Sequence, residues 1–242
     1  EISLYLLSKP SLRVAITCGT EAVNQNEAML KRFLPNFPDT TKSSNHVIER
    51  PKFQMSPEKV FFPLPFAVNF SAKCFRGAPY THSDGPKLQV LSSLMKIHYL
   101  HREIREKNGA YGGGAMYSPT SGIFSFFSYR DPKTLETLQT YKQAIDWVAN
   151  RKFSQQEMDE AKLSIFQSID APISVAQEGL IYFEDRISDD MRQLRREQLL
   201  SVTEDDVKKA AKILEQQEHL NWNSITIIGE GKPEILEDSK WK

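Results

Sequence analysis

The feature that most constrains the fold is a long apolar helical segment that runs directly into a β-hairpin. Asp84 is predicted to cap a helix that runs to about Lys107, with Pro86 in its first turn, and apolar residues recur along this segment. Asn108-Gly109 is predicted to end the helix, because both residues tolerate the left-handed backbone that a helix end needs. Two extended segments, 110–117 and 122–129, follow around a turn-rich break, and they predict an antiparallel hairpin.

The remaining elements are predicted from extended patterns and from capping motifs. Extended segments are expected at 12–18, 59–76 and 223–228, and helices at about 22–34, from Asp131-Pro132 to Asn150, and after the pairs Ser154/Glu157, Ser174/Gln177 and Thr203/Asp206. Strands, a long helix, a hairpin, several helices and a final strand follow in that order. This order predicts an α+β fold, with a mainly antiparallel sheet and helices packed on one face.

One break in composition divides the chain. The stretch 36–57 is rich in proline, serine and threonine and has almost no periodicity, so it is predicted to be an exposed linker. The regular part, 58–231, is expected to form one domain, and 232–242 is expected to be a tail. A length of 242 residues fits one or two domains with a sizeable core.

Composition excludes several classes of protein. Lys plus Arg is 31 and Asp plus Glu is 31, which argues against nucleic-acid binding by phosphate neutralisation and against a polybasic membrane-surface protein. No apolar run approaches the roughly 18–20 residues that span a bilayer. Cys18 and Cys74 are the only cysteines and form no C-x-x-C motif, so neither a disulfide framework nor a cysteine-based zinc site is expected.

Histidines on the long helix raise the question of a metal site. His98 and His101 are three residues apart, close to Glu103, and could share one helix face. However, the zinc-protease signatures H-E-x-x-H and H-x-x-E-H are absent around every histidine. No metal ligand is therefore expected in this chain, and the two histidines are interpreted as partly buried packing residues. No G-x-S-x-G motif for a nucleophilic serine is present either.

A glycine run opens the predicted hairpin. Gly112, Gly113 and Gly114 are consecutive, and glycines weaken a strand unless a ligand or another backbone must come close. The run lacks the Lys-Ser/Thr of a phosphate-binding loop. We interpret these three glycines as substrate-binding residues on a strand that pairs with an extended peptide. A merely twisted or bulged strand remains the alternative.

Arg105 and Tyr111 are the candidate catalytic residues. Arg105 lies in the last turn of the long helix, and Tyr111 follows just across the Asn-Gly turn. That turn can bring both side chains to the same space, where two donors could face one substrate carbonyl and the charge developing on it. The competing interpretation is a solvated arginine that pairs with Glu103 or Glu106.

The same residues match a known family. Segment 105–115, R-E-K-N-G-A-Y-G-G-G-A, resembles a signature of the pitrilysin-type inverted zinc metalloproteases, and most closely of the presequence protease branch that includes falcilysin. Further matching blocks occur in the same order, at 122–125, 128–132, 134–137, 159–163, 170–172 and 196–199. Asn108 stands where close relatives often have glycine, and asparagine also tolerates the left-handed turn.

This resemblance implies a processing-peptidase-like α+β domain and a place in a longer protein. The family consists of two halves that close on a peptide chamber, each half made of two related domains. The chain resembles the last domain, 58–231, preceded at 1–35 by the tail of the third. The zinc cofactor and its H-x-x-E-H motif belong to the first domain, outside this chain. By resemblance, Arg105 and Tyr111 reach the substrate backbone beside the zinc.

The resemblance also implies a function and its partners. The chain is expected to be the C-terminal, non-zinc-binding part of a zinc metallopeptidase that degrades short unstructured peptides, such as cleaved presequences, in the mitochondrial matrix. Its expected partners are peptide substrates and the zinc-carrying N-terminal half of the same protein, and the isolated chain is expected to be inactive. The alternative is a non-catalytic peptide-binding or scaffolding subunit of the same fold, for which no H-x-x-E-H would be found upstream.

Overall fold

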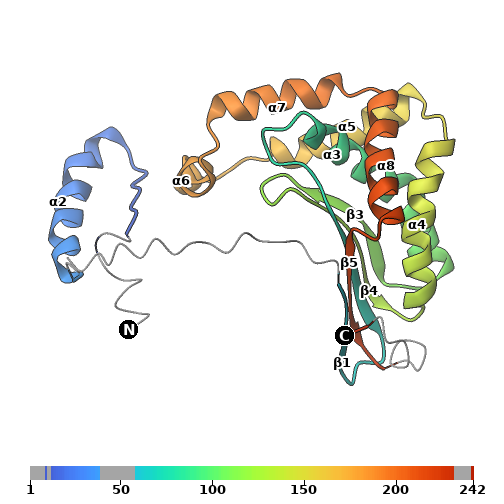
Figure 1. The fold of residues 1–242 in the computed structure, drawn as a ribbon. Helices are drawn as coiled ribbons and strands as arrows, with labels where there is room; N and C mark the ends of the chain where they lie inside the picture. Colours follow the sequence, from blue (N-terminus) through green and yellow to red (C-terminus); the bar gives the residue numbers. More distant parts are fainter. Residues whose placement is uncertain (1–8, 10–11, 39–57, 232–240) are drawn as a thin grey trace. The chain divides into compact units, whose positions relative to one another are not determined.

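The computed structural model describes residues 9, 12–38, 58–231 and 241–242. The chain divides into two units, and each is described here by itself (Figure 1). Unit 1 comprises Glu1–Gln54 and Pro172–Ser188, and unit 2 comprises Met55–Ala171 and Asp189–Lys242. Residues 172–188 therefore group with the N-terminal segment, although the sequence places them inside the expected domain 58–231. Most of the expected linker, 36–57, lies outside the described residues.

The helical elements that the structure describes in unit 1 are short, and none of them contains a buried residue. These elements are η2 (Thr20–Ala22), α2 (Val23–Phe33), η3 (Leu34–Asn36), η5 (Val175–Gln177) and α6 (Leu180–Asp185). The helix expected to stop at Pro35 is confirmed as α2. The strand expected at 12–18 is wrong: no described residue pairs with it, and Val14 and Ile16 are 48% and 44% exposed. A β-branched run becomes a strand only when another strand pairs with it.

The sheet of unit 2 has five strands in the order β1-β5-β2-β4-β3. The strands are β1 (Lys59–Pro63), β2 (Asn69–Arg76), β3 (Gly112–Ser118), β4 (Ile123–Asp131) and β5 (Asn223–Gly229). Only β1 and β5 are parallel, so the expected mainly antiparallel sheet and its β3–β4 hairpin are confirmed. The edge strand β1 ends at Pro63, and Lys242 forms backbone hydrogen bonds with Lys59 and Phe61 along it.

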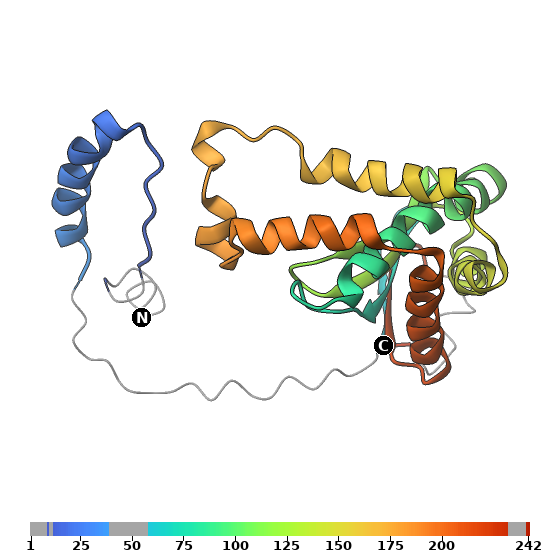
Figure 2. The same ribbon diagram turned by 90° about the horizontal axis from the view of Figure 1, so that it is seen from above.

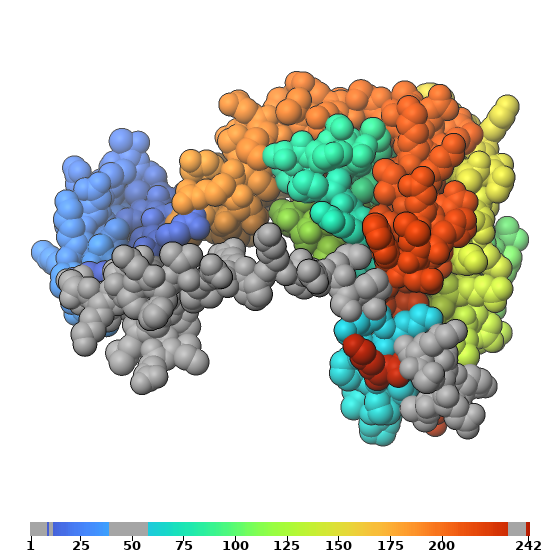
Figure 3. Space-filling view, in the orientation of Figure 1, coloured from blue at the N-terminus to red at the C-terminus, as the bar shows by residue number. Residues whose placement is uncertain are grey.

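Helices cover one face of this sheet (Figures 1 and 2). They are α3 (Asp84–Met95), η4 (Lys96–Lys107), α4 (Thr134–Asn150), α5 (Gln155–Ile169), α7 (Asp189–Ser201) and α8 (Glu204–His219). In the space-filling view α7 and α8, orange to red, form part of the outer surface of unit 2 (Figure 3). Side chains along β5 alternate between buried and half-buried, as expected when only one face is covered. The predicted α+β class is confirmed.

The core lies between the helices and the covered face. Phe124 and Phe126 of β4 are fully buried, and the Phe126 ring stacks on Tyr141 of α4 with ring centroids 5.2 Å apart. The Tyr141 hydroxyl lies 2.9 Å from Ser71 Oγ, and burial raises the pKa of this phenol. Aromatic packing therefore fixes α4 against β4, the strand whose end borders the candidate site.

The long helix changes its hydrogen bonding halfway. Its limits agree with the prediction, but α3 is an α-helix and η4 is a π-helix. The predicted cap is wrong, because Ser83 occupies the N-cap position and Asp84 instead pairs with Lys87 at 2.8 Å. The i→i+5 bonds of a π-helix put more residues into each turn. The α-helical spacing that would align His98 with His101 therefore does not apply.

Candidate functional site

Arg105 and Tyr111 are brought together where η4 turns into β3. Gly109 has a φ of +80°, and the amides of Gly109 and Ala110 donate to the carbonyls of Arg105 and Ile104, both at 3.1 Å. This left-handed reversal ends the helix as the sequence predicted. It places the Arg105 guanidinium carbon 6.0 Å from the centre of the Tyr111 ring, which is the range of a cation–π contact.

Both side chains are open to solvent. Tyr111 is 60% exposed, and Arg105 is exposed as well. The acidic partners considered for Arg105 are engaged elsewhere, since Glu103 accepts from Lys107 at 2.7 Å and the Glu106 carboxylate lies 3.6 Å from His101 Nδ1. In the part of the chain that the structure describes, Arg105 has no ion pair. The competing interpretation, a surface arginine paired with a neighbouring glutamate, is therefore not what the geometry shows.

Two further residues border Tyr111 that the sequence analysis did not single out. The Tyr129 ring lies 5.7 Å from the Tyr111 ring, and the Arg130 guanidinium carbon lies 5.3 Å from it. The Tyr111 amide also donates to the Arg130 carbonyl at 3.3 Å. Both residues lie at the end of β4, and the hairpin register pairs Gly112 with Tyr129. The predicted hairpin was the one sequence feature that could have pointed to them, because its strands had to pair in some register.

The glycine run is enclosed by neighbours from the same unit. A side chain at Gly112 would collide with the Tyr129 ring, and one at Gly113 would come within 2.8 Å of the Phe127 carbonyl oxygen. At Gly114 the nearest atom is the flexible Lys96 side chain, at 3.0 Å. The strand β3 lies at the edge of the sheet, which is where a peptide could pair. Close packing within the unit accounts for the glycines, and pairing with a peptide stays a prediction.

The face of the sheet that the helices leave uncovered carries large apolar side chains. Five of them, between 39% and 52% exposed, are Phe62, Phe70, Met116, Ile123 and Tyr129. The strand register places them on the same side as Gly112 and Gly114. Exposed apolar side chains on one face of a sheet can form a binding surface.

The two helix histidines lie in different surroundings. The His98 side chain is mostly buried, and its Nδ1 lies 3.8 Å from Glu157 Oε1, whereas His101 is half exposed. Hydrogen bonding to the Ser154 backbone and to Arg151 lowers the pKa of Glu157 and keeps that carboxylate occupied. Within the described ranges, no three His, Cys, Asp or Glu side chains gather to hold a metal ion. The residues that are described do not fit a zinc site.

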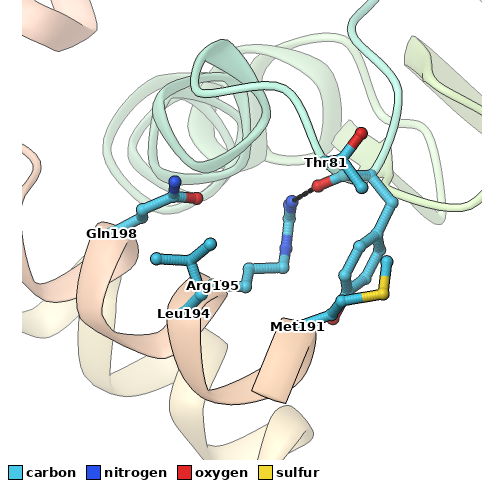
Figure 4. A pocket seen from close by; sticks show the side chains of 6 residues that line it. Thr81, Met191, Leu194, Arg195 and Gln198 are labelled. Atoms are coloured by element: carbon cyan, nitrogen blue, oxygen red, sulfur yellow. Dashed lines mark hydrogen bonds between the residues drawn. The ribbon is translucent and has the colours of Figure 1, made fainter. Parts of the chain in front are cut away.

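A small pocket between α7 and the segment before α3 serves packing. It is lined by Tyr80, Thr81, Met191, Leu194, Arg195 and Gln198 (Figure 4). Arg195 is 4% exposed, and it donates to the Tyr80 carbonyl at 3.0 Å and to Gln89 Oε1 at 2.7 Å. The cavity of about 40 Å³ has room for water molecules and not for a substrate. Arg195 thus links α7 to the core.

Two further observations concern the cysteines and the question of a membrane-spanning helix. Cys18 and Cys74 are half-buried free thiols, and burial raises the pKa of Cys74, which favours the unreactive thiol form. None of the helices that the structure describes combines the length and apolar character needed to cross a membrane.

Comparison with known sequences gives a consistent result. Residues 59–230 match the family model of the PreP C-terminal domain. The mitochondrial presequence protease of Yarrowia lipolytica is 41% identical over 241 residues, which cover 100% of this chain and 24% of that protein. Its counterpart in Eremothecium gossypii is 45% identical, covering 76% and 19%, and that in Mus musculus is 35% identical, covering 99% and 26%. The chain spans about a quarter of the length of these relatives.

Comparison with solved structures shows a shared fold. A protease from Helicobacter pylori superposes with a TM-score of 0.64 at 14% identity, over 88% of this chain and 53% of that one. The inactive domain of an M16 peptidase from Pseudomonas fluorescens gives 0.59 at 18% identity, over 89% and 52%. Pitrilysin gives 0.55 at 13% identity, over 78% and 22%.

Proposed function

The chain belongs to the family of PreP C-terminal domains, as its motif segments predicted, and from this membership we propose that it is the C-terminal part of a peptide-degrading metallopeptidase. The proposed substrates are short unstructured peptides, such as the cleaved presequences that give its mitochondrial relatives their name. The proposed location is the mitochondrial matrix. The proposed partner is the N-terminal half of the same protein, with residues 1–35 as the tail of a preceding domain.

One observation carries the role proposed for this chain: Arg105 and Tyr111 lie together on an open surface. The guanidinium carbon is 6.0 Å from the phenol ring, and among the described residues no carboxylate pairs with the arginine. Within the described ranges, neither side chain donates a hydrogen bond to another residue, so each has donors to offer a ligand. Two such donors can hold one peptide carbonyl and stabilise the negative charge that builds on its oxygen when it is attacked.

The metal that the family uses would be held outside this chain, because the described residues do not fit a zinc site. When bound there, zinc would supply an activated water molecule for attack on the peptide carbonyl. The residues of this chain would bind and orient the peptide backbone and would hold no metal. We therefore expect the isolated chain to hydrolyse no peptide.

The uncovered face of the sheet is proposed to line the chamber in which the two halves of the protein would hold a peptide. Its exposed apolar side chains offer contacts to an unfolded peptide that depend little on sequence, since burial of apolar surface is non-directional. At its border, Gly112–Gly114 on the edge strand β3 are the proposed backbone contacts. Edge pairing through main-chain groups would likewise accept many sequences.

Two conservative substitutions in the full-length protein test this proposal. Tyr111→Phe removes the hydroxyl and keeps the ring, and Arg105→Lys keeps the charge and loses the planar fork. Each is expected to lower kcat/KM by about 10²–10³, which corresponds to about 2–4 kcal/mol of transition-state stabilisation. Both side chains are exposed, so thermal unfolding should change little. Peptide-hydrolysis kinetics with parallel melts give both quantities.

A matched control is available in unit 1. Tyr182 is 55% exposed, and its ring centre lies 5.8 Å from the Arg186 guanidinium carbon. Tyr182→Phe therefore removes a hydroxyl from an exposed ring that also borders an arginine. It should leave kinetics unchanged. Wild-type kinetics for both Tyr111→Phe and Arg105→Lys would remove these residues from the site. A full-length protein that binds peptides without cleaving them would instead support the scaffolding alternative.

A further inference from the structure

Arg130 has an unusual backbone conformation beside the candidate site. Its φ is +49°, in the left-handed region, where side chains with a Cβ are strained. Among the described residues only Arg186 and Asn221 share this property without being glycine. Strained conformations of this kind persist only where the surrounding structure holds them, and they cluster at functional sites.

The conformation of Arg130 creates a β-bulge in β4. The register pairs Asn69 with Asp131 and Ser71 with Ser128, so two steps along β2 match three steps along β4. The extra residue lies at Tyr129–Arg130, and both of these successive side chains are exposed, which breaks the alternation of the strand. A bulge re-aims side chains at the point where it occurs. Here it turns two consecutive side chains toward the surface that carries Tyr111.

The chain on both sides of the bulge is firmly held. Asp131 is fully buried, and its carboxylate accepts from Ser128 Oγ and from the Lys133 amide, each at 2.8 Å. Ser128 Oγ also lies 2.8 Å from Ser71 Oγ in the neighbouring strand. These bonds fix the residues before and after the bulge, so the left-handed turn at Arg130 is built into the domain.

Arg130 holds Tyr111 in two ways. Its carbonyl accepts the Tyr111 amide at 3.3 Å, which ties down the main chain. Its guanidinium carbon lies 5.3 Å from the ring centre, closer than that of Arg105 at 6.0 Å. Tyr129 borders the same ring at 5.7 Å. An exposed phenol would otherwise have free rotation about its side-chain bonds, and these neighbours restrict it.

We propose that Arg130 is a positioning residue that directs the Tyr111 hydroxyl toward the substrate, an inference that rests on the proposed function of Tyr111. Arg130 acts through the ring and the amide of Tyr111 and need not touch the peptide. Preorganising a donor before the charge develops is what makes such a donor effective. The bulge supplies this preorganisation, because it brings the guanidinium of Arg130 over the ring of Tyr111, which lies just before the facing strand β3.

The test uses the full-length protein and a double-mutant cycle. Arg130→Gly keeps the left-handed backbone and removes the guanidinium, and Arg130→Asn does the same with a side chain that tolerates this conformation. We expect either variant to lower kcat/KM by about five- to tenfold, mainly through kcat, because this is the scale of a lost cation–π contact. Arg130→Lys, which keeps a cation, should recover part of the loss. In a Tyr111→Phe background, the same substitutions should cost less than about twofold.

The matched control is Arg186→Gly in unit 1. Arg186 also has a left-handed backbone conformation, and its guanidinium carbon lies 5.8 Å from the centre of the Tyr182 ring. This substitution should leave kinetics unchanged. If Tyr111→Phe lowers kcat/KM while Arg130→Gly and Arg130→Asn do not, the role of Arg130 is overturned and the proposed function stands. Equal losses with and without the Tyr111 hydroxyl would also overturn it. Wild-type kinetics for Tyr111→Phe would overturn both this inference and the proposed function.

Discussion

At the residue scale, the adjacent glycines Gly113 and Gly114 of β3 differ in what surrounds them. Gly113 faces a backbone carbonyl and Ile104, so an added Cβ would lie 2.8 Å from atoms that cannot move without shifting the hairpin. At Gly114 the three nearest atoms belong to the aliphatic part of Lys96, a side chain that can rotate away. A run of identical residues thus combines one position fixed by packing with one that tolerates change.

This difference predicts unequal costs for the same substitution. Gly113→Ala should lower the free energy of unfolding by about 1–3 kcal/mol, the usual cost of overpacking a site without free space. Gly114→Ala should change it by less than about 1 kcal/mol, because alanine also favours the strand over glycine. Urea unfolding of both variants measures the difference. Equal destabilisation would show that the space around β3 does not decide which glycines are needed.

At the scale of elements, local motifs with their own hydrogen bonds were predicted well. The capping pairs Ser154/Glu157 and Thr203/Asp206 are formed at the starts of α5 and α8. The pair Ser174/Gln177 is also formed, but it starts only one turn of 3₁₀ helix, because Gly179 follows with a φ of +76°. In these three cases the capping box located the start of the helix, and the residues that follow it determined how long the helix is.

The capping pair of α8 predicts a pH-dependent stability. The hydrogen bond from Thr203 lowers the pKa of Asp206 in the folded state, so this contribution is present above the unfolded pKa and is lost as pH falls through the folded pKa. Thr203→Ala should cost about 1 kcal/mol near pH 7. The cost should begin to shrink below about pH 4, the usual pKa of an aspartate in an unfolded chain, and should disappear as pH falls further through the lowered pKa of Asp206.

Urea unfolding at the two pH values, for the wild type and Thr203→Ala, tests this prediction. Ser174→Ala is the matched control, because the same kind of cap there begins an exposed turn without buried residues. It should change global stability little at either pH. A cost for Thr203→Ala that stays constant down to pH 3 would mean that the carboxylate of Asp206 does not contribute to the cap.

Features that depend on distant partners could not be predicted. The β-branched run at 12–18 has strand propensity, but a strand forms only where another strand pairs with it, and no described residue does so. The π-helical segment η4 has no composition signature, and its effect is to separate His98 from His101. The residues of the candidate site show the same contrast. The proximity of Arg105 and Tyr111 could be predicted from the local turn between them. The positions of Tyr129 and Arg130 could not, because they depend on the strand register and on the β-bulge.

At the scale of the whole molecule, the chain provides one helix-covered sheet with an open face and a candidate site at one edge. Its length is about a quarter of that of its relatives, which fits the proposal that it is one part of a longer protein. In that proposal Arg105 and Tyr111 become functional only when another part of the protein presents a peptide and an activated water to them. The two donors and the activated water would thus come from different parts of the protein.

The distance from Tyr111 Oη to the backbone of a bound peptide tests this claim most directly. It would be measured in a structure of the full-length protein with a peptide held at the zinc-bearing site. We expect a hydrogen bond of about 2.7–3.1 Å from Tyr111 to a peptide carbonyl oxygen, with the Arg105 guanidinium donating to the same backbone. A peptide bound at that site with both side chains beyond about 3.5 Å from every backbone oxygen would contradict it.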